Sequence, residues 1–240
     1  MTSFEKRIAL VTGASGGIGR RIAERLAAAG ARVALHYGSR ATPAEELAAA
    51  LPGAAAFAAD MRDPEAPDRL VDAVETELGP IDVLVANHGL SHPARYEQVD
   101  AAAFDETLAV NLRSPFLLAR RTLPGMAARG FGRLLFMGSV AGFTGGIVGP
   151  DYAASKAGLH GLTHFLARRV ASEGVTVNAI APALIERTSM LPGDPGALAT
   201  MIPVGRLGRP EEVADLALAV LRNAYLTNQV ISLDGGMHPR

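Results

Sequence analysis

The sequence contains no cysteine, only two lysines and no long hydrophobic run, and each scarcity narrows what the chain can do. Without cysteine there are no disulfides, no thiolate nucleophile and no cysteine-ligated metal. The first apolar run, residues 8–11, is too short for a signal sequence or a membrane span. The 240 residues carry a net charge of −1, so no overall field attracts nucleic acid or anionic membranes. We therefore expect a cytoplasmic protein that contacts neither nucleic acid nor membrane.

Short apolar runs alternate with longer helical segments along the whole chain. The strand-like runs are residues 8–11, 33–35, 54–59, 81–85, 134–137, 175–180 and 230–233, and the main helix-like segments are 18–29, 64–78, 104–128, 152–171 and 210–221. Alternating strands and helices form βαβ units, which build a parallel sheet covered on both faces. No linker divides the chain. We expect one α/β domain over residues 1–240, with about seven parallel strands in a doubly wound, Rossmann-type sheet.

The longest irregular stretch is the proline-containing segment 182–209. A loop of this length inside a compact domain is usually functional, often as a lid over a binding site. We expect segment 182–209 to cover the substrate.

A glycine-rich turn, residues 12–19, joins the first strand-like run directly to the first helix-like segment. Glycines let the backbone turn tightly and approach a pyrophosphate, while a helix N-terminus offers free N–H groups and the positive end of its dipole. Such a turn can be purely structural, but a strand before it and a helix after it are the context that dinucleotide binding requires. We therefore expect a dinucleotide to be held by Gly13, Ser15, Gly17, Ile18 and Gly19.

One of the two lysines, Lys156, stands four residues after Tyr152. Positions i and i+4 share one face of a helix, so the ammonium can lie beside the phenol. A neighbouring positive charge favours phenolate and lowers the pKa of tyrosine, which makes it a proton donor usable near neutral pH. The pair could also be an ordinary polar contact on a helix surface.

The spacing Gly-x-x-x-Gly-x-Gly after Thr12 resembles that of the short-chain dehydrogenase/reductase family. Further positions extend the resemblance over nearly the whole chain, namely Asp60, Asn87, Gly89, Asn111, Ser139, Tyr152, Lys156 and the triplet Asp234-Gly235-Gly236. The resemblance implies hydride transfer between a nicotinamide cofactor and a carbonyl or alcohol. It also implies a homo-oligomer, most often a homotetramer.

The same resemblance assigns a role to each polar residue. Tyr152 donates a proton to the carbonyl oxygen, while Lys156 lowers the pKa of the phenol and binds the nicotinamide ribose. Ser139 positions the carbonyl oxygen, and Asn111 holds a water of a proton relay. Ser139 could alternatively cap a strand end, and Asn111 could satisfy a kinked helix. Cofactor contacts are implied at Asp60, Met61, Asn87, Gly89, Tyr152, Lys156, Pro182 and Ile185.

Four positions depart from the family pattern. Ala86 and His88 stand where the family often has asparagine and alanine, and we interpret His88 as a packing residue rather than a substrate contact. Ala183 replaces a glycine, and the threonine expected near the carboxamide of the cofactor comes one residue late, as Thr188, with Arg187 beside it. We therefore favour Ile185 over Thr188 as a cofactor contact.

No acidic residue follows the second strand-like run, where NAD-specific proteins place one for the ribose 2′-hydroxyl. Ser39 and Arg40 could hold a 2′-phosphate there by hydrogen bond and charge. The family's other basic position is Gly16 in this chain, and Arg40 could equally be a solvated loop charge. The sequence favours NADP(H) over NAD(H).

Mostly apolar residues are expected to wall the substrate pocket. The candidates are His92, Tyr96, Phe143, Ile147, Val148, Leu184, Met190 and Leu191. A ketone or a β-keto thioester suits such a pocket better than a sugar. Residues 145–150 and the Asp-Gly-Gly ending resemble the 3-oxoacyl-[acyl-carrier-protein] reductase branch of the family.

Other interpretations remain open. The chain could oxidise a secondary alcohol with NAD, or bind NADP without catalysis, although non-catalytic relatives typically lose the tyrosine or the lysine. The pairs 120–121 and 168–169 are arginines that could help dock an acidic carrier protein. His160 and His164 have a spacing that could bind metal, but no third ligand is apparent, and we expect no metal site.

Overall fold

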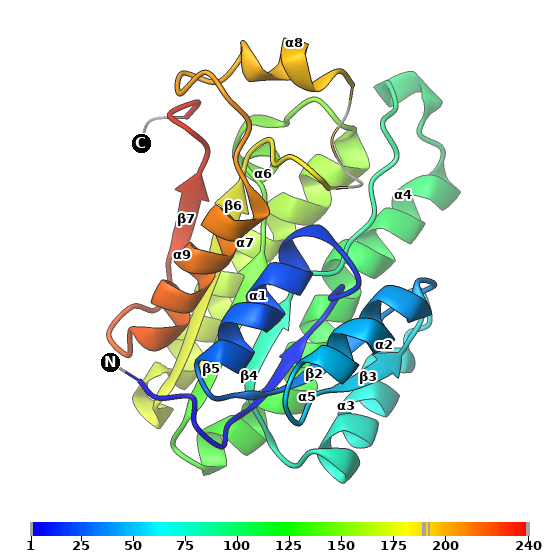
Figure 1. The fold of residues 1–240 in the computed structure, drawn as a ribbon. Coiled ribbons are helices and arrows are strands. Elements are labelled where there is room, and N and C mark those ends of the chain that lie inside the picture. Colours follow the sequence, from blue (N-terminus) through cyan, green and yellow to red (C-terminus); the bar gives the residue numbers. More distant parts are fainter. Residues whose placement is uncertain (1, 189–190, 192, 239–240) are drawn as a thin grey trace.

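The computed structural model describes residues 2–188, 191 and 193–238. All seven strands are parallel and form one sheet in the order β3-β2-β1-β4-β5-β6-β7 (Figure 1). The strands are β1 Ile8–Val11, β2 Arg32–Tyr37, β3 Ala55–Ala58, β4 Ile81–Ala86, β5 Gly132–Met137, β6 Val175–Pro182 and β7 Val230–Leu233. The predicted seven-stranded, doubly wound α/β fold is confirmed. The strand order reverses between β1 and β4, which is where open α/β sheets bind their ligands.

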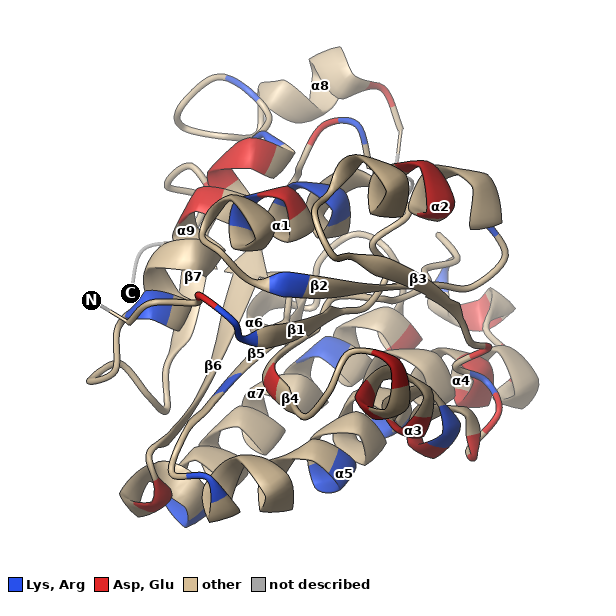
Figure 2. Ribbon diagram, turned by 60° about the horizontal axis from the view of Figure 1, so that its bottom comes forward, with Lys and Arg blue, Asp and Glu red and all other residues tan. Residues whose placement is uncertain are grey.

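Helices cover both faces of the sheet (Figure 2). One face carries α1 Gly17–Ala28, α2 Ala41–Ala50 and α9 Pro210–Arg222, and the other carries α3 Ala66–Glu77, α4 Ala101–Leu108, α5 Ser114–Ala128 and α7 Pro150–Val170. Each face buries its own apolar core. Ile22, Leu26 and Val213 belong to the first core, and Leu118 and Leu159 to the second. Burial of apolar surface on both sides explains why the strands read as continuous apolar runs.

The segment predicted as one helix over 104–128 is interrupted. It divides into α4, a π-helical turn Ala109–Arg113 and α5. Pro115 has no N–H with which to bond the carbonyl of Asn111, so the regular ladder cannot pass through this point. Single π-helical turns inside helices occur often at functional sites. Asn111 lies in this turn, but its side chain bonds Leu90 and Ser155 rather than the backbone of its own helix.

The lid segment between β6 and α9 is less irregular than expected. It contains the short helix α8, Pro195–Ala199, and a single bridge between Ile185 and Gly208. Leu198, Ile202 and Leu207 form a small apolar cluster of their own. Residues 195–207 therefore form a packed layer above the carboxyl ends of the strands (Figure 1). Met190, a predicted pocket residue, lies outside the described residues.

Candidate active site

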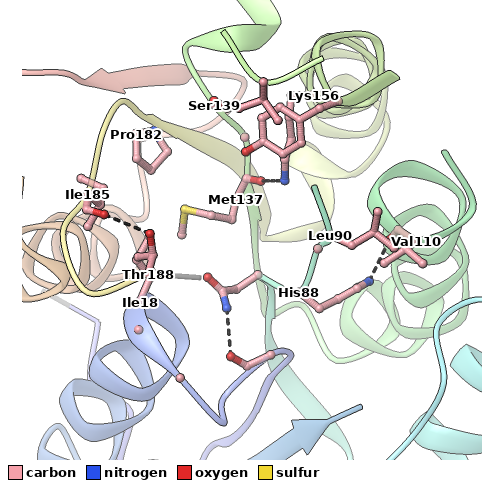
Figure 3. A pocket seen from close by; sticks show the side chains of 18 of the residues that line it. Ile18, His88, Leu90, Val110, Met137, Ser139, Lys156, Pro182, Ile185 and Thr188 are labelled. Carbon is pink, nitrogen blue, oxygen red and sulfur yellow. Dashed lines mark hydrogen bonds between the residues drawn. The ribbon is translucent and has the colours of Figure 1, made fainter. Parts of the chain in front are cut away.

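A cleft of about 650 Å³ opens at the carboxyl ends of the strands, beneath the lid. Its volume falls in the range usual for small-molecule and cofactor sites. Lys156 of α7 and Ser139, which follows β5, line one side of the cleft (Figure 3). Ile18 of α1 lines the cleft from another side. The predicted cofactor and catalytic residues that line it are Gly13, Ser15, Gly17, Ile18, Ser39, Arg40, Asp60, Met61, Asn87, Gly89, Ser139, Tyr152, Lys156, Pro182 and Ile185.

The glycine-rich turn has the backbone geometry of a phosphate cradle. Gly13 and Gly17 adopt φ angles of 66° and 46°, in the left-handed region that favours glycine. Helix α1 begins without a side-chain cap on its N-terminal N–H groups, which leaves them available to an anion. Gly19 lies behind the cradle, where an added methyl group would come within 2.3 Å of the Gly13 carbonyl oxygen. These features fit a dinucleotide pyrophosphate.

A buried histidine that the sequence analysis did not single out supports this turn. The Gly13 N–H donates to Nδ1 of His36 at 3.2 Å, and Nε2 of His36 donates to the Ala59 carbonyl at 3.0 Å. Burial lowers the pKa of His36 from its usual 6.5 to about 4. The ring is therefore neutral at physiological pH and fixes the first glycine to the end of β3. Its position inside a strand gave no signal of this role.

His88 is buried, connects three elements by hydrogen bonds and also lines the cleft. Its Nδ1 lies 2.6 Å from the Thr12 hydroxyl, and its Nε2 lies 2.6 Å from the Ser114 hydroxyl and 3.1 Å from the Val110 carbonyl oxygen. Burial, and secondarily the nearby His36 and Lys156, hold the pKa of His88 well below its usual 6.5. The neutral ring thus joins the start of the cradle to the π-helical turn and α5.

Tyr152 and Lys156 lie on the same buried face of α7, but the phenol is not acidified. The Lys156 ammonium donates to the Met137 carbonyl at 2.8 Å and lies 5.6 Å from the centre of the Tyr152 ring. Burial raises the pKa of Tyr152 above its usual 10, and a hydrogen bond with Ser139 offsets this only in part. Burial lowers the pKa of Lys156 to about 8. The expected lowering does not appear in the net pKa of Tyr152, because desolvation of the phenol outweighs the contacts that favour phenolate.

Asn111 does not line the cleft. Its side-chain amide bonds both backbone groups of Leu90, accepting from the N–H at 2.8 Å and donating to the carbonyl at 2.9 Å. It also donates to the Ser155 hydroxyl at 3.2 Å, and Ser155 in turn donates to the Tyr152 carbonyl at 2.7 Å. Asn111 therefore ties the loop after β4 to the helix that carries Tyr152.

The guanidinium of Arg40 lies where a side chain at residue 16 would project. A methyl group added at Gly16 would come within 2.7 Å of Nη2 of Arg40. Ser39 and Arg40 both line the cleft, and Arg40 forms no ion pair with the described acidic residues. Asp60 is already paired with Arg62 at 2.6 Å, and that contact lowers the pKa of its carboxyl.

The predicted pocket residues divide into two groups. Ile147, Val148, Leu184 and Leu191 line the cleft. The lining does not include His92, Tyr96 or Phe143. Tyr96 is 75% exposed, and the ring of Phe143 packs on that of His160 at 4.2 Å. The apolar wall on the substrate side is thus built by the loop before α7 and by the lid.

Two further searches concern only the described part of the chain. No three histidine, aspartate or glutamate side chains there gather closely enough to hold a metal ion. His164 instead bonds the Asn228 side chain at 2.8 Å. No helix among these residues is both long enough and apolar enough to cross a membrane.

The parallel sheet and the cleft at its carboxyl ends define a Rossmann-like α/β protein, and comparison with known proteins gives its family. The family profile described as short chain dehydrogenase matches residues 7–194, and the chain belongs to that family. It is 37% identical to the 3-oxoacyl-[acyl-carrier-protein] reductase FabG of Escherichia coli, with 98% of this chain and 99% of the relative aligned. It is 39% identical to the 3-oxoacyl-[acyl-carrier-protein] reductase MabA of Mycobacterium bovis, with 98% and 94% aligned. Identity to the acetoacetyl-CoA reductase of Allochromatium vinosum is 37%, with 96% and 98% aligned.

Proposed function

We propose that the chain is an NADP(H)-dependent reductase that converts a hydrophobic ketone to a secondary alcohol. The observation that carries this proposal is the convergence of Ser139, Tyr152 and Lys156 in one cleft with the glycine cradle. The nicotinamide cofactor supplies the hydride when bound. Tyr152 donates its hydroxyl proton to the carbonyl oxygen, and its raised pKa keeps that proton in place until charge develops. Ser139 donates a second hydrogen bond to the same oxygen.

In this proposal Lys156 stabilises the deprotonated form of Tyr152, and Asn111 positions the helix that carries it. The buried ammonium of Lys156 stabilises the phenolate that forms once Tyr152 has given up its proton, and it binds the nicotinamide ribose. Asn111 holds the Leu90 loop and the middle of α7 together, and it orders the polar path by which a proton returns to Tyr152.

The substrate we propose is a 3-oxoacyl thioester or a carbonyl compound of similar hydrophobic character. The apolar wall of Ile147, Val148, Leu184 and Leu191 supports it. The names of the relatives point to thioesters of an acyl carrier protein or of coenzyme A. Arg120 and Arg121 are paired with Asp68 and Asp72 of α3, so they offer no free basic patch to an acidic carrier. Acidic residues of α3 lie beside basic residues of α5 (Figure 2). The other arginine pair, Arg168 and Arg169, is exposed at the end of α7. We therefore propose that the cleft recognises the thioester itself, and that a carrier protein, where one takes part, meets Arg168 and Arg169 rather than Arg120 and Arg121.

The preference for NADP(H) rests on Arg40. Its guanidinium lies over Gly16 at the mouth of the cradle, beside Ser39, and it is free to bind a 2′-phosphate by charge-assisted hydrogen bonds. A fluorescence titration with NADPH and NADH tests the preference, and tighter binding of NADH would overturn it.

Replacement of Tyr152 by phenylalanine tests the mechanism. It removes the proton donor but keeps the ring, so acetoacetyl-thioester-dependent oxidation of NADPH should fall by about 10²-fold or more. NADPH binding should persist. Tyr225, which is 98% exposed, provides the matched control, and Tyr225→Phe should retain full activity. Normal turnover of Tyr152→Phe would contradict the mechanism.

We also propose a cytoplasmic homotetramer. An open apolar groove runs between the π-helical turn, α5 and α7, and its members include Leu112, Phe116 and Leu162. Phe116 is 38% exposed, which suits a partner subunit better than water. Light scattering gives the mass directly, and a monomer of 24.9 kDa would refute this assembly.

A further inference from the structure

Arg187, in the segment after β6, has a positive φ angle, and its guanidinium pairs with two glutamates. Its φ angle is 56°, in the left-handed region that a side-chain-bearing residue adopts only when its surroundings enforce it. Nη2 of Arg187 lies 3.0 Å from Glu186 and 2.9 Å from Glu211, the latter in the first turn of α9. Arg187 also lines the cleft. The strained backbone thus holds a positive side chain at the edge of the cofactor cleft.

The lid backbone at this point lies directly over the phosphate cradle. A methyl group added at Gly17 would come 3.3 Å from Cγ2 of Thr188 and 3.5 Å from the carbonyl oxygen of Arg187. Gly17 opens helix α1, whose N-terminal N–H groups lack a side-chain cap. The guanidinium of Arg187 pairs with Glu211, which Arg21 of α1 also binds, so the guanidinium and the positive end of the α1 dipole lie at the same end of this helix, next to the place proposed for the pyrophosphate.

Glu211, the partner of Arg187 on α9, has a second basic partner of its own. Glu211 is also bound by Nε of Arg21 at 2.9 Å, so its carboxylate stays paired when Arg187 moves away. The Arg187 side chain is 56% exposed, and ion pairs of such exposure are weak and readily exchanged. A pyrophosphate accepts two parallel hydrogen bonds from a guanidinium and competes well with the single oxygens that Glu186 and Glu211 each offer to one nitrogen.

We propose that Arg187 is a cofactor-binding residue of the lid, which exchanges Glu211 for the cofactor pyrophosphate when the dinucleotide binds. This inference rests on the proposed function. The exchange would join the segment after β6 to the cofactor, because the backbone of Arg187 and Thr188 already lies over Gly17. Glu211 is then the resting partner of Arg187.

Fluorescence and competition titrations without substrate test the exchange. Arg187→Gln should weaken NADPH binding about tenfold, the loss expected for one charged bidentate contact. Adenosine 2′-monophosphate, which lacks the pyrophosphate, should bind Arg187→Gln and the unsubstituted protein equally. Arg206 pairs with Glu212 on the same helix but lies off the cleft lining, so Arg206→Gln is the matched control and should bind both ligands normally.

Glu211→Gln distinguishes an Arg187 that leaves Glu211 on cofactor binding from one that stays paired with Glu211. If Arg187 leaves Glu211 on binding, removing that carboxylate frees the guanidinium, and NADPH should bind about twofold to threefold more tightly. If the pair merely holds the lid in place, Glu211→Gln and Arg187→Gln should weaken NADPH alike. That parallel loss, or unchanged NADPH affinity in Arg187→Gln, would overturn the inference and leave the proposed function standing. An unsubstituted protein that binds neither NADPH nor NADH would overturn both.

Discussion

The ammonium of Lys156 donates a hydrogen bond to the main-chain carbonyl of Met137, at 2.8 Å, rather than to the phenol one helical turn away. The contact fixes α7 to the last residue of β5 (Figure 3). It leaves the ammonium two further protons to donate toward the cleft from one compact nitrogen, whereas a guanidinium would spread its donors over a larger planar group.

The first prediction concerns the identity of this cation. Lys156→Arg keeps the charge but places a larger planar group in a buried site, so the contact with Met137 and the proximity to Tyr152 cannot both persist. We expect kcat/KM for NADPH-dependent ketone reduction to fall by about 10²-fold. The chain's other lysine, Lys6, is the matched control, and steady-state kinetics of Lys6→Arg should be unchanged. Full activity of Lys156→Arg would show that any cation suffices.

The second prediction is that the rate of ketone reduction declines at alkaline pH. Because the pKa of Lys156 is lowered to about 8, the ammonium is lost as pH rises through that value, and with it the charge that stabilises the phenolate of Tyr152. We expect kcat/KM for reduction to decline above about pH 8. Stopped-flow hydride transfer over the same range separates this effect from product release. A rate that stays flat to about pH 10 would rule out the assignment.

The third prediction links His36 to acid stability. The folded protein keeps His36 neutral down to its pKa of about 4, whereas the unfolded chain takes up the proton near 6.5. The unfolded state therefore binds more protons between these values, and the free energy of unfolding should fall as pH drops through this window, by roughly 3 kcal/mol at its lower end.

Urea unfolding at about pH 7 and about pH 5 measures this loss. His36→Gln lacks the titrating ring and should show a smaller loss between the two pH values, whatever its stability at neutral pH. Exposed His92 is the control, and His92→Gln should leave the loss unchanged. An equal loss in His36→Gln would assign the acid sensitivity elsewhere.

The fourth prediction concerns a buried carboxylate beside Tyr152. The Thr107 hydroxyl donates to Oδ2 of Asp151 at 2.5 Å, and both residues are almost fully buried. Oδ1 of Asp151 has no hydrogen-bond partner within the described ranges. Thr107→Val removes the donor, which should lower the free energy of unfolding by about 1–3 kcal/mol.

A double-mutant cycle with Asp151→Asn checks the origin of that loss. A neutral amide is cheaper to leave in the interior than a carboxylate, so Thr107→Val should cost less in the Asp151→Asn background. Thr200→Val, at an exposed threonine, is expected to change the unfolding free energy by less than about 0.5 kcal/mol. Additive costs in the cycle would mean that the two side chains are not coupled.

The fold could be read from the sequence because every strand is buried on both faces. Val83, Leu84 and Val85 are fully buried in the middle of the sheet, and such runs stand out against the helical periodicity around them. The π-helical turn at 109–113 could not be foreseen in the same way. Its extra residue per turn is set by Pro115 and by the bonds of Asn111 to a loop about twenty residues away.

The sequence predicts which residues meet in the cleft where they belong to a motif of fixed spacing. It does not predict contacts between residues that only folding brings together. The residues of the glycine-rich turn and the pair on α7 meet in one cleft because each follows directly from a strand or helix. His36 and the shared guanidinium of Arg187 depend on partners brought close only by folding. The pKa of Tyr152 was misjudged for the same reason, since sequence spacing reveals a nearby charge but not the depth of burial.

Arg40 and residue 16 share the mouth of the cradle, although they belong to two different loops. A side chain added at residue 16 would come 2.7 Å from Nη2 of Arg40, so the flexible guanidinium would have to shift to admit it. A substitution at residue 16 therefore also changes the position of the group that we propose to hold the 2′-phosphate, and cofactor preference depends on the two loops together.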